Sequence, residues 1–221
     1  MDNMRTIRVT GKGVVKVHPD MIRITITLES THKDYGEALK RSSKDTETLR
    51  DLVEGLGFAK TDLKTLSFDI DTEYESYEER GNYRQRFVGY KYEHELKLEF
   101  DSDNDRLGKI VYALAGSDIN PEFSISYTVK DKEAVKNVLL EKSIADAKEK
   151  AAILSNAAGV TLKDIVNINY SWGEMDLEVS LMTNCFSNRT ERWSSGDGCP
   201  MNFDPDDITV TDTVTVVWKL E

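Results

Sequence analysis

The chain has 221 residues, with 29 Lys and Arg against 40 Asp and Glu, and its formal net charge is −11. A negative protein is repelled by phosphate groups, so this balance argues against nucleic acid and anionic membranes as partners. Only 4 Pro and 13 Gly are present, and no apolar run approaches the roughly 18 residues of a membrane span. We therefore expect one globular domain, 1–221, with no nucleic-acid partner and no membrane insertion.

Charge spacing and cysteine content bear on the compartment. Charged residues recur at short intervals through residues 1–30, which leaves no room there for the apolar block of a secretory signal. We expect a cytoplasmic protein, with a mature form whose signal has been removed as the alternative. The two cysteines, Cys185 and Cys199, do not define a disulfide framework, and whether they pair is left open.

In the first half of the chain, apolar and polar residues alternate in several segments, which predicts strands, and one segment between them has helical spacing. The expected order is a strand at 5–11, a strand at 22–28, a helix at 34–56, a strand at 66–70 and a strand at 90–100. In the third strand we expect Leu66, Phe68 and Ile70 to share the inward face. A hairpin turn at 78–85, centred on Gly81-Asn82, joins the last two strands.

The second half adds two helices and three strands. We expect a helix at 104–115, a strand at 123–129, a helix at 131–158, a strand at 164–171 and a closing strand at 213–220. The expected apolar stripe of the long helix consists of Val135, Val138, Leu139, Ala145, Ala152 and Leu154. Asp131 is a suitable N-cap for this helix and Gly159 a suitable stop.

This order of elements predicts an α+β fold. Strands with one polar face are typical of antiparallel sheets. The six elements between about 21 and 129 have the βαββαβ order of a ferredoxin-like core. We expect flanking strands and a third long helix to extend that core.

Residues 172–206 lack regular periodicity. Seven acids and two bases give this stretch a charge of −5, and it also holds Trp172, Trp193 and both cysteines. Disordered segments are poor in aromatic residues, so disorder does not explain the composition. Two interpretations stay open: a long loop that folds back on its own sheet, or an arm that packs on another subunit or protein partner.

The sequence contains no convincing zinc-binding or calcium-binding motif. His18, His32 and His94 have no zinc-like spacing, and we expect His94 to be a partly buried packing residue. The triplet Asp101, Asp103 and Asp105 begins like a calcium loop but lacks its glycine and its final Glu, so these residues are interpreted as helix caps.

Two further patterns receive structural interpretations. Gly11-Lys12-Gly13 leads into a strand rather than a helix, so we interpret it as a bend between strands. The carboxylates of Asp69, Asp71, Glu73 and Glu75 alternate on one strand and are expected to form a solvated face, offset by Arg84 and Arg86 across the hairpin. We predict no catalytic residue, no cofactor and no metal site.

Six segments in order resemble the SIMPL-domain family, also called domain of unknown function 541. They are Ile7–Glu29, with its V-x-G-x-G start and Pro19-Asp20 pair, Thr65–Tyr74, Val88-Gly89-Tyr90, Leu107–Ile110, the Ala-rich run from Ala145 to Gly159, and Pro205–Leu220. The resemblance covers nearly the whole chain except 172–204.

The resemblance implies several properties that composition does not. Bacterial members are mostly periplasmic or envelope-associated, some are similar to ring-shaped oligomers, and some are linked to oxidative or envelope stress. A mammalian relative is a signalling adaptor for a kinase of the interleukin-1 receptor pathway. No catalytic residue is established for the family.

Three functional hypotheses remain. The first is a non-enzymatic protein that forms a homo-oligomer through strand edges, helix faces or the 172–206 arm, because open strand edges need cover. The second is a small-molecule or ion-binding module with a cleft between sheet and helices. The third, an enzyme of unknown reaction, has only scattered acids in its favour.

Overall fold

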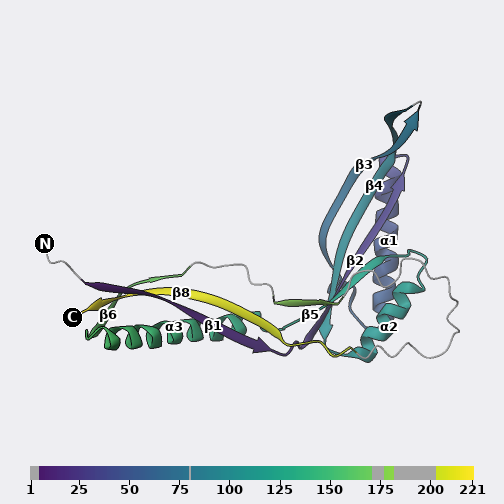
Figure 1. Ribbon diagram of the computed structural model, residues 1–221. Coiled ribbons are helices and arrows are strands. Elements are labelled where there is room, and N and C mark those ends of the chain that lie inside the picture. Colours follow the sequence, from purple (N-terminus) through teal and green to yellow (C-terminus); the bar gives the residue numbers. More distant parts are fainter. Residues whose placement is uncertain (1–4, 80, 171–176, 182–202) are drawn as a thin grey trace. The chain divides into compact units, whose positions relative to one another are not determined.

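The computed structural model describes residues 5–79, 81–170, 177–181 and 203–221. Its contacts divide the chain into two compact units (Figure 1). Unit 1 comprises Met1–Pro19, Thr128–Val179 and Pro205–Glu221, and unit 2 comprises Asp20–Tyr127 and Ser180–Asp204. Each unit has its own sheet and its own apolar clusters. The expectation of a single domain over 1–221 stays a prediction.

Unit 2 holds the ferredoxin-like core. Its elements are β2 (Met21–His32), α1 (Tyr35–Gly55), the short 3-10 helix η1 (Lys60–Asp62), β3 (Lys64–Glu79), β4 (Asn82–Asp101), α2 (Asn104–Ala115) and β5 (Glu122–Thr128). The sheet order is β3-β4-β2-β5, with β7 (Glu178–Leu181) beyond β5. Both the α+β class and the ferredoxin-like order are confirmed.

Aspartate side chains cap both α-helices of this unit. The Asp34 carboxylate accepts hydrogen bonds from the N–H groups of Gly36 and Glu37, and the Asp103 carboxylate accepts one from Arg106 N–H at 3.0 Å. Each cap supplies an acceptor for amides that lack an intrahelical partner. The interpretation of Asp103 as a helix cap is therefore confirmed.

The core of unit 2 lies between its sheet and its helices. Fully buried side chains come from alternate positions of β2 and β4 and from the inward faces of α1 and α2; they include Ile22, Ile24, Ile26, Leu28, Leu49, Leu96, Leu98, Leu107, Ile110 and Leu114. Helix α1 packs on β2 and β4. Strand β3 lies outside that cover, and almost all of its residues are exposed.

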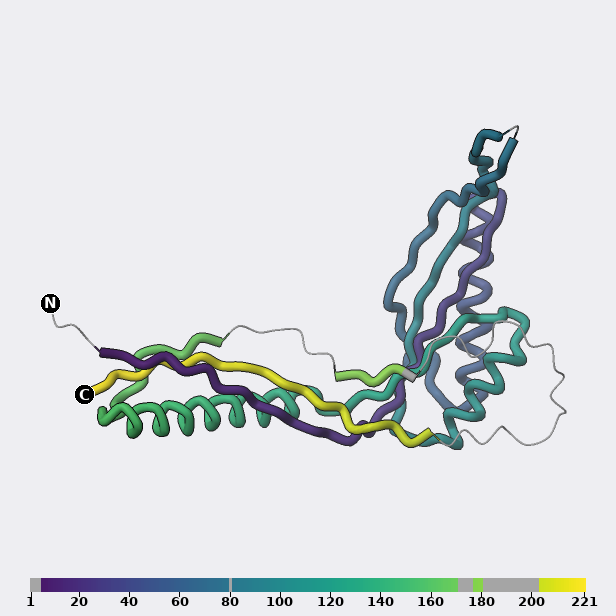
Figure 2. Tube along the Cα trace, viewed as in Figure 1, coloured from purple at the N-terminus to yellow at the C-terminus, as the bar shows by residue number. Residues whose placement is uncertain are grey.

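Unit 1 is a second antiparallel sheet covered by one helix. Strands β1 (Thr6–Val17), β8 (Ile208–Leu220) and β6 (Leu162–Asn169) lie in the order β1-β8-β6, and α3 (Lys132–Ala157) packs on β1 and β8 (Figures 1 and 2). The flanking strands were expected to extend the ferredoxin-like sheet. They form a separate sheet instead, because β1 pairs with β8 along its whole length.

One sequence interpretation is wrong in unit 1 and another is right only in part. Gly11 and Gly13 are not a bend, since β1 runs without interruption from Thr6 to Val17. Of the expected stripe of the long helix, Leu139 is buried, but Val138 is 42% exposed and Leu154 is 51% exposed. The buried positions are Leu139, Ser143, Ala147, Ala151 and Ser155, which recur every four residues.

The described part of the 172–206 stretch is small. It contains the strand β7 and Leu177, whose side chain is buried in a cluster of unit 1. The expectation that no regular element occurs there is thus wrong at Glu178–Leu181. The rest of the arm hypothesis, including Cys185, Cys199, Trp172 and Trp193, lies outside the described residues. Within those described, no helix has the length and apolarity needed to cross a membrane.

Candidate functional site

A belt of polar side chains crosses the buried face of α1. Asp45 is only 4% exposed, and its carboxylate accepts a hydrogen bond from Tyr92 Oη at 2.6 Å and another from Arg41 Nε at 2.9 Å. Burial, together with the bond to the Asp45 carboxylate, raises the pKa of Tyr92. A buried carboxylate with two donors is satisfied, so this pair positions α1 on the sheet.

His94 continues this buried polar belt. Thr46 Oγ1 donates its hydrogen to the carbonyl oxygen of Ser42, so it accepts at 3.0 Å from His94 Nδ1. His94 Nε2 then accepts from the Thr65 hydroxyl at 2.9 Å. These two bonds select the tautomer with its hydrogen on Nδ1. Because His94 is 8% exposed and contacts the Phe68 ring, the prediction of a partly buried packing residue is confirmed.

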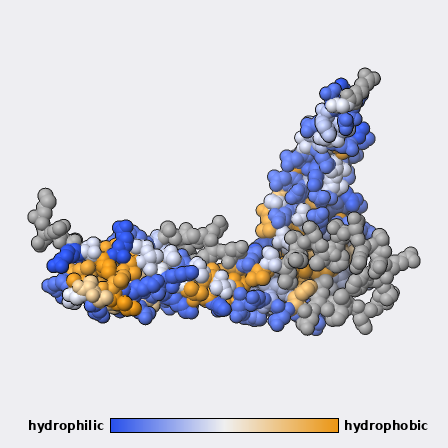
Figure 3. All heavy atoms as spheres, in the orientation of Figure 1, coloured by the Kyte–Doolittle hydropathy of each residue, from blue (hydrophilic) through white to orange (hydrophobic). Residues whose placement is uncertain are grey.

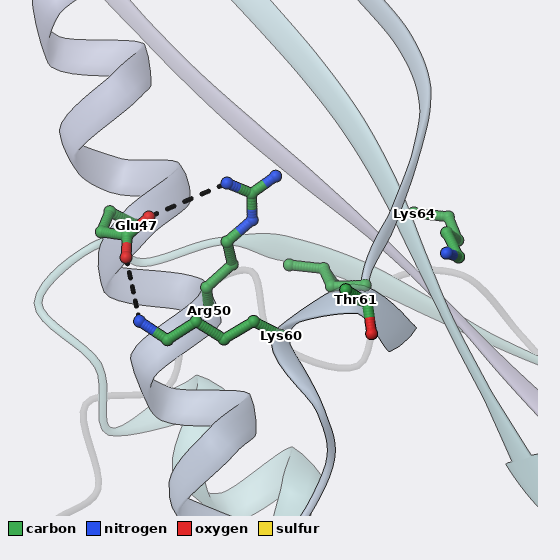
Figure 4. Close-up of a pocket in the computed structure, with 6 residues that line it drawn as sticks. Glu47, Arg50, Lys60, Thr61 and Lys64 are labelled. Atoms are coloured by element: carbon green, nitrogen blue, oxygen red, sulfur yellow. Dashed lines mark hydrogen bonds and ion pairs between the residues drawn. The ribbon is translucent and has the colours of Figure 1, made fainter.

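A pocket of about 410 Å³ opens beside this belt, where α1, η1 and the start of β3 meet (Figure 4). Its lining residues are Glu47, Arg50, Lys60, Thr61, Leu63 and Lys64. Lys60 Nζ lies 2.9 Å from the Glu47 carboxylate and 2.6 Å from that of Asp51. The hydrogen bond to Asp51, followed by that to Glu47, raises the pKa of Lys60.

The cations of the pocket are not equally engaged. Arg50 has one long contact, 3.8 Å, to the Glu47 carboxylate. Lys64 has no ion pair or hydrogen bond among the described residues, and it lies across the strands from Lys97. In Figure 4 its ammonium group lies beyond Thr61, away from the Lys60–Glu47 contact. The pocket can attract a small anion, but most of its charged side chains form ion pairs with one another or with neighbouring residues.

The β3–β4 hairpin is the second candidate surface. Pairing between β2 and β4 ends at His32 and Tyr90, so residues 73–79 and 82–89 form a two-stranded ribbon that extends past α1 (Figure 1). We call this segment the hairpin ribbon. A register shift between Glu73 and Tyr74 leaves Val88 unpaired and places Phe87 opposite Tyr74. Such a bulge turns side chains toward a new face.

The two faces of the hairpin ribbon differ in chemistry. On one face the Phe87 ring lies 5.7 Å from the Tyr74 ring and 5.4 Å from the Tyr90 ring. On the other, Arg86 lies 2.5 Å from Glu75 and Arg84 lies 2.8 Å from Glu79. The expected offset of Asp69, Asp71, Glu73 and Glu75 is confirmed for Arg86 alone, because Arg84 pairs with Glu79, which lies outside that set. The solvated face is confirmed, except that Glu73 is half-buried and accepts from the Thr31 hydroxyl.

Because of a second bulge, the predicted inward face of β3 is wrong at Leu66. The register shifts between Thr65, opposite Leu96, and Ser67, opposite Glu95. Leu66 therefore takes no place in the ladder and is 48% exposed. Thr65 takes the inward position that was expected for Leu66, and it reaches His94 there.

The other sequence candidates remain apart. His18 is exposed and lies 3.3 Å from Asp207, while His32 Nε2 is buried without a hydrogen-bond partner in the described part of the chain. Within that same part, no group of His, Cys, Asp or Glu side chains is arranged to hold a metal ion.

Sequence reasoning missed the role of the glycines in β1. A Cβ on Gly11 would lie 2.0 Å from Ser143 O, and one on Gly13 would lie 2.3 Å from Leu139 O. The glycines therefore let the backbone of α3 approach the strand. The detectable signal was two glycines on one strand face together with small residues every four positions in a helix.

These features define an α+β protein with a ferredoxin-like unit and a helix-covered three-stranded unit. The chain belongs to the SIMPL family, described as a protein of unknown function (DUF541), whose model matches residues 7–218. The match spans both units and confirms the resemblance. The G-x-G start has its physical reason in the α3 contact.

Two curated relatives carry the same name. The chain is 26% identical over 164 residues to the 26 kDa periplasmic immunogenic protein of Brucella abortus (strain S19). It is 25% identical over 164 residues to that of Brucella melitensis biotype 1. Each match covers 74% of this chain and 65% of the relative's length. The relatives' periplasmic naming does not match the expected cytoplasmic location, which stays a prediction.

Proposed function

We propose that this protein is non-enzymatic and acts by associating with further copies of itself. The observation that supports this is that the edge strand β6 exposes apolar side chains. This strand lies at the edge of the unit 1 sheet, and Ile165, Val166 and Ile168 are 50%, 47% and 47% exposed. An exposed apolar edge strand is a template for pairing with another chain. Figure 3 shows apolar side chains gathered on unit 1 near the chain termini.

The other edge of the same sheet offers a contrast. Along β1, the Asp146 carboxylate of α3 accepts from Lys12 N–H at 2.6 Å, and Ser143 Oγ accepts from Gly13 N–H at 2.9 Å. Helix α3 thus engages the amides of β1. In the described residues, the outer side of β6 has no comparable hydrogen bond.

The charges of β6 permit a symmetric contact. Antiparallel pairing of two copies about Val166 would set Lys163 opposite Asn169 and Asp164 opposite Ile168. Like charges directly opposite each other destabilise a pair of strands, and this register has none. The contact would be isologous, as in most homodimers.

Solution mass by light scattering at two concentrations tests the proposal. We expect a discrete mass above 25.1 kDa for the natural chain. Val166→Lys should lower it, while Ile153→Lys, at an exposed position of α3, serves as the matched control and should not. A mass of 25.1 kDa for the natural chain at both concentrations would refute self-association.

The arm forms a separate part of the proposal, as a contact to another subunit or to a protein partner. Deleting 182–202 keeps Leu177 and Phe203, which pack on clusters of the two units. A smaller particle, or loss of a captured partner, supports the arm. An unchanged mass and unchanged capture contradict it.

The proposal extends to a cytoplasmic location and a stress-related role. Charge spacing in residues 1–30 predicts the cytoplasm, whereas the name of the two relatives points to the periplasm. Cell fractionation distinguishes the two. The family resemblance implies a stress-related role, which predicts that cells lacking the protein survive peroxide less well.

A second candidate function is small-anion binding at the pocket in Figure 4. The observation that favours it is Lys64, which faces Lys97 across the strands and has no partner among the described groups. Phosphate should then raise the melting temperature, and Lys64→Gln should abolish this rise. No rise in the natural chain would remove the candidate.

A further inference from the structure

Among the described residues of unit 2, the longest strand edge without a neighbouring strand is the outer edge of β3. β3 spans Lys64–Glu79 and is the terminal strand of its sheet. Of its residues, only Ile70 and Glu73 are half-buried and the rest are exposed. In the described residues its backbone has hydrogen bonds only to β4. An edge of this kind supplies one half of a ladder that an extended peptide can complete.

Charge restricts which strand can pair there. β3 carries six carboxylates and one lysine; the acids are Asp69, Asp71, Glu73, Glu75, Glu78 and Glu79. A second β3 would set carboxylates against carboxylates, which disfavours pairing with the same strand of another copy. The edge therefore favours a basic segment.

The preference for a basic segment is clearest at Asp69. The strand registers place Glu29 opposite Glu93, and Glu93 opposite Asp69, so three carboxylates form one row that ends at the open edge. Lys91 Nζ lies 2.6 Å from Glu29. Asp69 itself has no partner among the described groups. A cation beside Asp69 would reduce the repulsion within this row.

The opposite face of the same edge is apolar. Phe68 is 41% exposed, Tyr74 is 54% exposed, and Ile70 between them is half-buried. Side chains of a strand alternate between the two faces of a sheet. A strand added to β3 thus sets every second residue beside carboxylates and the others beside apolar side chains.

We propose that the β3 edge from Ser67 to Tyr74 binds an extended segment of a partner protein in which basic and apolar residues alternate. The segment adds to the sheet as a further strand. Backbone hydrogen bonds provide affinity, and the two faces of the edge provide specificity. This surface lies in unit 2 and does not depend on self-association through β6.

Fluorescence anisotropy with the full chain and labelled peptides of about eight residues, an ordinary strand length, tests this. The probe alternates Lys and Val, and its control has the same composition in two blocks. We expect the alternating peptide to bind at least about tenfold more tightly, with binding that weakens in salt. Equal binding of both peptides would overturn the proposal, because it would show charge attraction alone.

Charge-reversed variants locate the site. Asp69→Lys combined with Asp71→Lys should weaken binding at least about tenfold. Glu141→Lys with Glu149→Lys makes the same charge change at exposed positions of α3 and should leave binding nearly unchanged. An equal loss in both variants would overturn the assignment to β3. Thermal melting followed by circular dichroism checks that each variant is folded.

A backbone-modified probe distinguishes strand addition from side-chain contacts. N-methylation at alternate residues of the Lys–Val peptide removes the amides on one edge, and we expect this to abolish binding. Unchanged binding would refute strand addition. If Asp69→Lys with Asp71→Lys lowers the solution mass without changing peptide affinity, a second copy occupies the edge and the partner proposal fails.

Discussion

Helices α1 and α3 each cover an antiparallel sheet, and they do so by different means. Under α1, side chains from both layers fill the interface, including the buried pair Asp45 and Tyr92. Under α3, the helix backbone comes so close to β1 that Gly11 and Gly13 leave no space for a Cβ atom. A helix can thus be held by interlocking side chains or by close backbone approach, and each solution is sensitive to different substitutions.

The largest effect should come from adding volume under α3. We expect Gly11→Ala to lower the free energy of unfolding by about 3 kcal/mol, because the new Cβ meets backbone atoms that have little room to move. Urea denaturation, with hydrogen exchange of the β1 amides, measures the loss. Gly55→Ala is the matched control: nothing lies within 4 Å of its Cβ position, and a helical alanine should stabilise by about 0.5–1 kcal/mol. Equal effects would contradict the close-approach explanation.

Under α1, the expected sensitivity is to lost polar partners. Asp45→Ala leaves the buried Tyr92 hydroxyl without its acceptor and should cost about 2–3 kcal/mol. Tyr92→Phe should cost about 1–2 kcal/mol. The double variant should lose less than the sum of the two, because no orphaned hydroxyl remains. Strictly additive losses in denaturant titrations would show that the pair does not interact.

The buried polar belt also predicts a pH dependence of stability. Burial, and then the charge of Arg50, hold the pKa of His94 below its ordinary value. The unfolded chain therefore binds a proton at a higher pH than the folded protein does. Stability should fall as the pH drops below about 6.5, until the folded pKa is reached. His94→Gln should flatten this slope in melting curves from pH 8 to pH 5, and an unchanged slope would assign it to other groups.

The smallest effect should come from the outer face of α3. Ile153 is 60% exposed, so Ile153→Ser should change the free energy of unfolding by no more than about 0.5 kcal/mol. Ala151→Leu, on the buried face, should cost about 1–3 kcal/mol by overpacking. Thermal melts of the two variants test the assignment of faces. If Ile153→Ser lost more stability than Ala151→Leu, the assignment of the buried and exposed faces of α3 would be wrong.

Much of the fold could be predicted because local signals were unambiguous. The α2 helix begins and ends where its spacing indicates, and Asp103 caps it. The hairpin turn is where Gly81-Asn82 predicts it, with Gly81 at φ +79°. The candidate surfaces were harder to predict from the sequence, because strand edges and rows of charged side chains depend on which strands become neighbours.

The faces of β3 and α3 mark where local pattern was insufficient. Alternation alone puts Leu66 inward, but a bulge against β4 exposes it and turns Thr65 toward His94. Helical periodicity favours the larger apolar residues of α3, yet Ala147 and Ala151 are buried because only small side chains fit against β1. Neither a bulge nor a close approach leaves a clear mark within one segment.

Periodicity, capping residues and turn glycines specify the helices and strands of this chain, since each acts within a few residues. Tertiary contacts alone decide that β1, β6 and β8 form a separate sheet, that α3 covers the β1 edge, and that β3 and β6 are terminal strands of their sheets. The physical reason is that burial and edge pairing are properties of partners distant in sequence. Spacing within one strand shows which faces are apolar, but not what covers them.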